Sequence, residues 1–100
     1  MAKILFVEDD QRIRELVCRH LSDEGHLVTS ESSGLDGLRS ITSESPEVLI
    51  LDLGLPDLDG RELCRMMRRT GVKCPIIILT DAGSDADTIL GLESGANDYI

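Results

Sequence analysis

The chain has 100 residues, of which 41% are hydrophobic, and its formal net charge is −9. This length supports one domain with a single core, and the acidic charge argues against direct binding of nucleic acid or an anionic membrane. The apolar runs are too short for a transmembrane segment or a signal peptide, and three cysteines without CxxC spacing fit free thiols in a reducing compartment. We therefore expect one cytoplasmic domain at residues 1–100.

Predicted strands and helices alternate along the whole chain. Apolar runs predict strands at residues 4–7, 27–29, 48–52 and 76–79, with a fifth strand opening at 98–100. Predicted helices start at Gln11, Gly34, Arg61 and Asp85, and end near Gly25, at the Ser43–Pro46 cluster, at Arg69 and at Glu93. In the second helix we expect Leu35, Leu38 and Ile41 to face inward. Such alternation predicts a doubly wound parallel α/β sheet with helices on both faces.

The stretch VLILDLGLPDLDG, residues 48–60, carries the strongest local signal. Its apolar run predicts a strand buried on both faces that ends in a carboxylate, Asp52. Gly54 and Pro56 then break the strand, and Asp59 is placed to cap the helix that follows. In an open α/β sheet, ligands bind beyond the carboxyl ends of the strands, where Asp52 would lie.

Polar side chains also follow two other predicted strands. Glu8, Asp9 and Asp10 come directly after the first strand, and Thr80 ends the fourth. Because parallel strands share one carboxyl edge, these residues and Asp52 should gather at the same rim. Crowded carboxylates repel one another unless a cation lies among them, and their oxygens suit Mg²⁺.

A magnesium ion between Asp9 and Asp52 would leave an oxygen of Asp52 able to attack phosphorus and form an acyl phosphate. The Thr80 hydroxyl could donate a hydrogen bond to a phosphoryl oxygen. Asp10, which directly precedes a predicted helix, is interpreted as its cap.

Four ordered motifs carry a family resemblance. They are Glu8-Asp9, LDLGLPDLDG around Asp52, IIILT ending at Thr80, and GLESGANDY leading to Tyr99. With them the chain resembles the receiver domain of bacterial two-component response regulators, and its details lean towards the OmpR/PhoB subfamily. The resemblance implies a flavodoxin-like (CheY-like) sheet with strand order 2-1-3-4-5.

The same resemblance implies roles for individual residues. Asp52 would accept a phosphoryl group from a sensor histidine kinase, and Thr80 and Tyr99 would reorient in response. Mg²⁺ would be bound by Asp9, Asp52 and the main-chain carbonyl of Gly54, with Glu8 acting through water. The domain would catalyse its own phosphorylation and dephosphorylation and turn over no external metabolite. Full-length members add a winged-helix DNA-binding domain that this chain does not contain, so transcription control would act through that domain and nucleic acid would not bind here.

The chain departs from the family pattern in three places. It stops at Ile100, before the expected strand-five lysine and last helix, which implies a truncated domain with an exposed edge on strand four and a half-covered sheet face. We expect such a chain to form a homodimer or strand-exchanged oligomer, or to aggregate. Asp81, an additional carboxylate, should slow phosphorylation, and Thr88 replaces a basic residue that many members use for dimer contacts.

Three alternatives differ in class. A phosphorylation-independent pseudo-receiver, acting as a protein interaction module, would fit the missing lysine, although the intact set of Glu8, Asp9, Asp52 and Thr80 argues against it. A flavodoxin-like cofactor carrier needs a hydroxyl-rich or glycine-rich phosphate loop after strand one, where this chain has three acids. A haloacid-dehalogenase-type phosphatase needs a second Asp where Gly54 stands.

Overall fold

The computed structural model describes residues 1–52, 54–79 and 98–99, and the following statements concern these ranges. Its elements are β1 (Lys3–Val7), α1 (Gln11–Asp23), β2 (Leu27–Glu31), α2 (Gly34–Glu44), β3 (Val48–Asp52), α3 (Gly60–Arg69), β4 (Ile76–Leu79) and β5 (Asp98–Tyr99). The strands form one parallel sheet in the order β2-β1-β3-β4-β5, which confirms the predicted fold. The expected helix at residues 85–93, with Asp81 and Thr88, lies outside the described residues.

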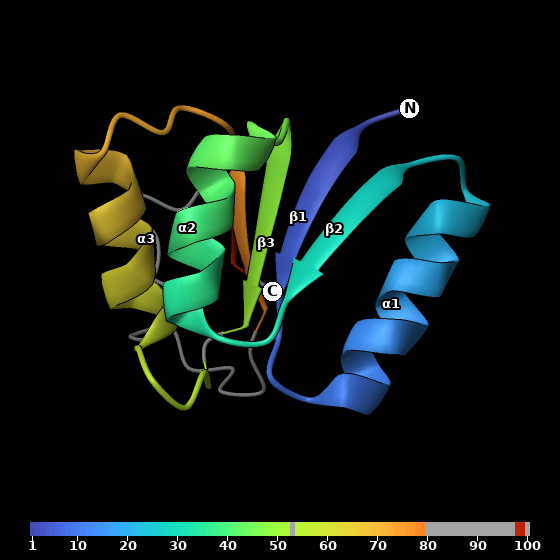
Figure 1. The fold of residues 1–100 in the computed structure, drawn as a ribbon, viewed down its shortest axis with the longest axis horizontal. Coiled ribbons are helices and arrows are strands. Elements are labelled where there is room, and N and C mark those ends of the chain that lie inside the picture. Colours follow the sequence, from blue (N-terminus) through green and yellow to red (C-terminus); the bar gives the residue numbers. More distant parts are fainter. Residues whose placement is uncertain (53, 80–97, 100) are drawn as a thin grey trace.

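The helices lie on both faces of the sheet. Figure 1 shows α1 on one side of the strands and α2 with α3 on the other. Between the sheet and the α2–α3 layer lies the main core, formed by Leu5, Val7, Ile41, Leu49, Leu51, Leu55, Leu63, Cys64, Met67, Ile76 and Ile78. Alternate residues of β1, β3 and β4 supply this core because successive strand side chains point to opposite faces. None of the helices described is long and apolar enough to cross a membrane.

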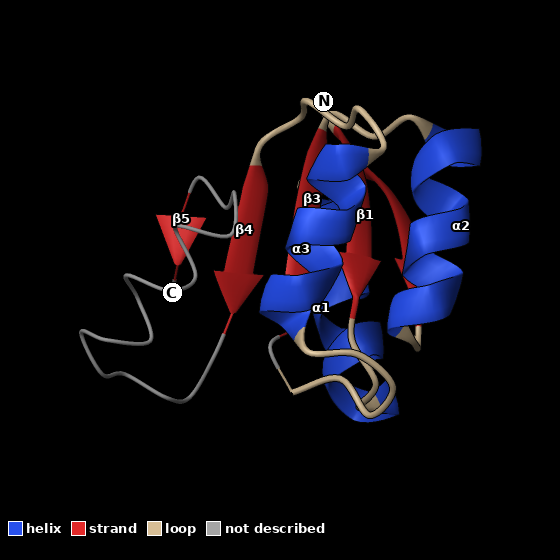
Figure 2. Cartoon of the chain, turned by 90° about the vertical axis from the view of Figure 1, so that its left-hand side faces the viewer, coloured by secondary structure: helices blue, strands red, loops and turns tan. Residues whose placement is uncertain are grey.

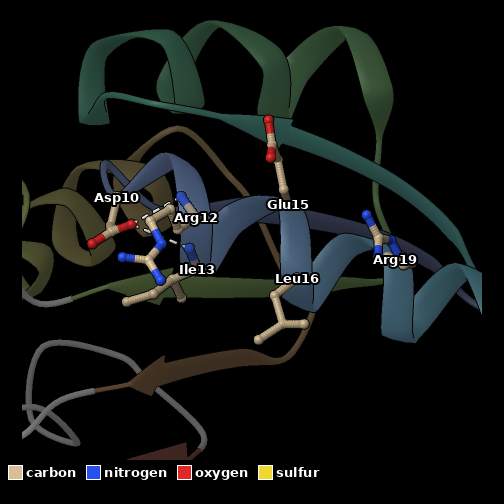
Figure 3. Close-up of a pocket in the computed structure, with 6 residues that line it drawn as sticks. All are labelled: Asp10, Arg12, Ile13, Glu15, Leu16 and Arg19. Carbon is tan, nitrogen blue, oxygen red and sulfur yellow. Dashed lines mark hydrogen bonds between the residues drawn. The ribbon is translucent and has the colours of Figure 1, made fainter.

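The sheet face beside α1 is less well covered. Helix α1 has no buried residue, and its Ile13 and Leu16 side chains are 47% and 66% exposed. They line a groove of about 480 Å³ along α1 (Figure 3). The expectation that β3 is buried on both faces is therefore wrong in part, because Leu49 and Leu51 are buried but Ile50 is only half-buried.

Strand β4 has a short β5 beside it, in agreement with the predicted strand order, so the expected exposed edge on strand four is wrong in part. Ile77 and Ile78 pair with Asp98 and Tyr99 of β5, which lies beside β4 in Figure 2. Strand β2 also runs further than predicted, to Glu31, because its pairing with β1 continues to the end of that strand. The last two residues of β2, Ser30 and Glu31, are polar, so a prediction based on apolar runs did not include them.

Helix α2 presents small residues to the sheet. A Cβ on Gly37 would lie 2.8 Å from Cγ2 of Val7, which is closer than real Cβ contacts allow. Because the helix lies so near β1, Gly37 and Ile41 are buried whereas Leu35 is 49% exposed. The prediction that Leu35 faces inward is therefore wrong, since the closest approach selects glycine and turns Leu35 outward.

Helix ends follow the capping residues in the sequence. The Asp10 carboxylate accepts hydrogen bonds from the backbone N–H groups of Arg12 and Ile13, at 2.9 and 3.2 Å. Asp59 accepts from the Arg61 N–H at 2.8 Å. Both caps were predicted, and each satisfies a donor that the first turn of a helix leaves unpaired.

Candidate functional site

The candidate site lies at the carboxyl edge of the central strands. Strands β1 and β3 are neighbours, and Val7 pairs with Leu51, so the next residues, Glu8 and Asp52, leave the sheet side by side. In Figure 1 the strands run downward, and this edge is at the bottom, where α1 begins. The parallel sheet thus brings together acids that are more than 40 residues apart in sequence.

Glu8, Asp9 and Asp52 form a compact group of carboxylates. One oxygen of each lies within 4.8 Å of the others, and this is the one such group of potential metal ligands within the described ranges. Glu8 is only 6% exposed, Asp52 is half-buried and Asp9 is exposed. Asp10 does not join the group because its carboxylate caps α1, as the sequence predicted.

The electrostatics of the group reflect its crowding. Burial, followed by the charge of Asp52 and a hydrogen bond to its side chain, raises the pKa of Glu8 from 4.5 to about 7. Burial also raises the pKa of Asp52, while the Gly54 backbone N–H and the Glu8 side chain act in the opposite direction. In the metal-free protein, Glu8 therefore holds a proton below about pH 7 and donates it to the Asp52 carboxylate. A divalent cation bound to these oxygens would replace that proton.

The backbone carrying the acids is held from two sides. The Glu8 N–H donates to the Glu31 carbonyl at 3.0 Å, which ties the residue to β2. From α1, Nη1 of Arg14 donates to the Glu8 carbonyl at 2.8 Å and, more weakly, to the Asp9 carbonyl at 3.5 Å. Our sequence reasoning missed Arg14. An arginine one turn into the helix that follows an acidic loop was the signal available.

Of the remaining predicted site residues, the structure describes Gly54 fully, Tyr99 by its backbone alone and Thr80 not at all. Gly54 lies against Asp52, since a Cβ on Gly54 would be 3.9 Å from Oδ2 of Asp52. Tyr99 lies in β5 opposite Ile78, but its side chain is outside the described part of the structure. Thr80 follows β4 and also lies outside that part, so its role and the metal contact of the Gly54 carbonyl stay predictions.

Comparison with known families decides the assignment. The sequence model of the response regulator receiver domain matches residues 4–100. The chain belongs to the response regulator receiver family. Among curated relatives of this receiver, the transcriptional regulatory protein AfsQ1 of Streptomyces coelicolor is 44% identical over 100 residues, which are the whole chain and 44% of AfsQ1. The response regulator MprA of Mycobacterium tuberculosis is 42% identical over 98 residues, which are 98% of the chain and 43% of MprA.

These relatives confirm the resemblance to OmpR-type regulators. The receiver spans less than half the length of the curated relatives it matches. Solved structures agree: the Francisella response regulator 1452 receiver domain has a TM-score of 0.96 and 30% identity, covering 100% of this chain and 83% of that one. The BeF3-activated N-terminal receiver domain of Klebsiella pneumoniae RstA has a TM-score of 0.92 and 41% identity, covering 98% of this chain and 83% of that one.

Proposed function

We propose that this receiver is a phosphoacceptor switch that takes a phosphoryl group on Asp52 from a sensor histidine kinase. The observation that carries the proposal is the clustering of Glu8, Asp9 and Asp52 within 4.8 Å at the end of β1 and β3. Folding alone gives no reason to crowd three carboxylates, because each raises the cost of ionising the others. The family assignment supports the same chemistry.

Asp52 is the best placed nucleophile of the three. It is half-buried at the end of a central strand, and the Gly54 N–H orients its carboxylate. A carboxylate oxygen of Asp52 attacks phosphorus, the bond from phosphorus to the imidazole nitrogen of a phosphohistidine breaks, and the leaving imidazole takes a proton from solvent. Water later attacks the same phosphorus, which releases phosphate and restores the carboxylate.

The donor set fits Mg²⁺. All three side chains offer carboxylate oxygens, no histidine or cysteine joins them in the described ranges, and one face of the group is open through exposed Asp9. Mg²⁺ uses one or two carboxylates together with water and phosphate oxygens. Asp9 and Asp52 would hold the ion, with the Gly54 carbonyl as a further ligand and Glu8 acting through water. When bound, the ion neutralises charge on the transferring phosphoryl group.

Thr80 and Tyr99 complete the proposed switch by reorienting after phosphorylation. The domain turns over no external substrate, and we place it in the cytoplasm with its kinase. Relatives more than twice as long leave room for an output domain, and the name of AfsQ1 as a transcriptional regulatory protein supports a DNA-binding output in the whole protein. Nucleic acid would then bind through that output domain and not through this acidic receiver.

Intact-mass analysis tests the proposal. The protein is incubated with acetyl phosphate with and without Mg²⁺, beside Asp52→Asn and the surface control Asp36→Asn. We expect one added phosphoryl group in the parent and in Asp36→Asn, dependent on Mg²⁺, and none in Asp52→Asn. No adduct in the parent would reject the phosphoacceptor and favour the pseudo-receiver. An adduct that persists in Asp52→Asn would show that another residue accepts the phosphoryl group.

A further inference from the structure

The loop that follows β3 is bound to the beginning of α2 by one carboxylate. Asp57 lies in this loop, and its Oδ1 accepts a hydrogen bond from the Gly34 N–H while its Oδ2 accepts from the Leu35 N–H, both at 2.9 Å. The Leu35 and Gly34 N–H groups lower the pKa of Asp57, because both hydrogen bonds favour the ionised carboxylate. Helix α2 also has its own cap, since Oγ of Ser33 accepts from the Asp36 N–H at 3.1 Å.

Apolar packing joins the same two segments. A Cβ on Gly34 would lie 3.1 Å from both Cβ and Cδ1 of Leu58, so the glycine allows the loop and the helix to approach closely. Gly34 is buried, and Leu58 packs against the core. The loop is therefore held to α2 by a polar contact and an adjoining apolar contact, from residues more than 20 positions apart.

The other end of this loop touches the acidic site. The Gly54 N–H donates to the Asp52 carboxylate, and the intervening Leu55 side chain is buried in the core. Figure 1 shows the loop crossing below α2 and α3 at the edge of the sheet where β1 and β3 end. The backbone from Asp57 through the buried Leu55 to Gly54 thus connects the first turn of α2 to the Asp52 carboxylate.

We propose that Asp57 is a positioning residue for the acidic site, which holds the loop so that Gly54 stays against Asp52. The inference rests on the proposed function, since it concerns the same magnesium and phosphoryl site. Asp57 touches neither the acids nor the expected position of a ligand, and it acts through the backbone of residues 54–57. Small displacements of metal ligands are costly because Mg²⁺ demands near-ideal octahedral geometry.

Two capping variants of the same helix separate positioning from stability. Asp57→Ala and Ser33→Ala each remove a side-chain acceptor from the first turn of α2, but only Asp57 connects that turn to the loop. Asp57→Asn provides a conservative variant, because its amide oxygen can still accept one of the two hydrogen bonds. Circular dichroism and thermal unfolding would establish that each variant folds and how far each is destabilised.

The readouts are the Mg²⁺ dissociation constant from calorimetry and the rate of phosphorylation by acetyl phosphate over a range of Mg²⁺ concentrations. We expect Asp57→Ala to weaken Mg²⁺ binding about tenfold, the lower end of what supporting residues around metal ligands contribute. Its phosphorylation rate should recover at saturating Mg²⁺, and Asp57→Asn should lie between it and the parent. Ser33→Ala should lose a similar amount of thermal stability and keep the affinity of the parent.

Equal Mg²⁺ affinity in Asp57→Ala and Ser33→Ala would overturn the inference while leaving the phosphoacceptor function intact. A parent that binds Mg²⁺ but gains no phosphoryl group would reject the proposed function, and the order of Mg²⁺ affinities among the variants would still decide the role of Asp57. A parent that binds no Mg²⁺ would overturn both.

Discussion

Replacing Glu8 with Gln should stabilise the metal-free protein at pH 8, even though Glu8 belongs to the candidate site. The carboxyl group is 6% exposed and lies in a group with Asp9 and Asp52. Burial and these neighbours raise its pKa to about 7. Gln keeps the size of the side chain and its hydrogen-bonding capacity but cannot acquire the charge.

The sign follows from proton linkage. Between pH 4.5, the usual pKa of the group, and pH 7, the folded protein holds more protons at Glu8 than the unfolded chain does. Stability therefore falls as the pH rises through this window and stays low above it. One pKa unit corresponds to about 1.4 kcal/mol, so the shift from 4.5 to about 7 sets an upper limit of about 3–4 kcal/mol. Because solvent reaches the rim through exposed Asp9, we expect about half of this limit.

Urea unfolding followed by circular dichroism from pH 4 to pH 8 measures the effect. We expect the parent to lose stability relative to Glu8→Gln by about 1.5 kcal/mol across this range without metal. The control Glu15→Gln makes the same chemical change on the exposed surface of α1 and should follow the parent. Saturating Mg²⁺ at 100 times its dissociation constant should stabilise the parent by about 2.7 kcal/mol. Parallel curves for the parent and Glu8→Gln would refute the reasoning.

Four further outcomes are expected. Asp10→Ala should cost about 1 kcal/mol of stability through the lost cap and leave Mg²⁺ affinity unchanged, and weaker Mg²⁺ binding in calorimetry would make Asp10 a ligand instead. Gly37→Ala should destabilise the protein by about 1–2 kcal/mol in urea unfolding, since the new methyl group meets Val7 on a rigid strand, whereas a gain in stability would show that α2 can shift. Asp81→Ala should speed phosphorylation by acetyl phosphate, and an unchanged rate would reject repulsion by that carboxylate. Light scattering should show self-association that Leu16→Ser reduces, and a monodisperse parent monomer would contradict a role for the exposed α1 face.

Much of the fold follows from local sequence patterns. Within the described residues, the apolar runs of four or five residues form strands and the three stretches with helical spacing form helices, because burial of one face dominates the choice of secondary structure. Asp10 and Asp59 mark helix starts because each carboxylate accepts a hydrogen bond from the backbone N–H only two residues further along the chain. The acidic group was predictable from topology, because the carboxyl ends of parallel strands share one edge.

Contacts between distant segments were not predictable in this way. The sequence gives no sign that Asp57 would accept hydrogen bonds from residues 34 and 35, and an Asp after Pro suggests only a turn. The prediction that Leu35 faces inward is wrong for a related reason. Its spacing fits an inward face, but the close approach of Gly37 to Val7 fixes the rotation of α2 about its axis. Periodicity describes one helix, whereas its rotation depends on what packs against it.

The most direct test of the central assignment is chemical identification of the phosphorylated residue. After treatment with acetyl phosphate and Mg²⁺, borohydride reduces the acyl carbon of an aspartyl phosphate to an alcohol and releases phosphate, which leaves homoserine in the chain. Peptide mapping by mass spectrometry then locates that residue. The account predicts homoserine at position 52 in the parent and none when Mg²⁺ is omitted. Homoserine at position 9 or 10, or at no position in a protein that folds and binds Mg²⁺, would contradict it.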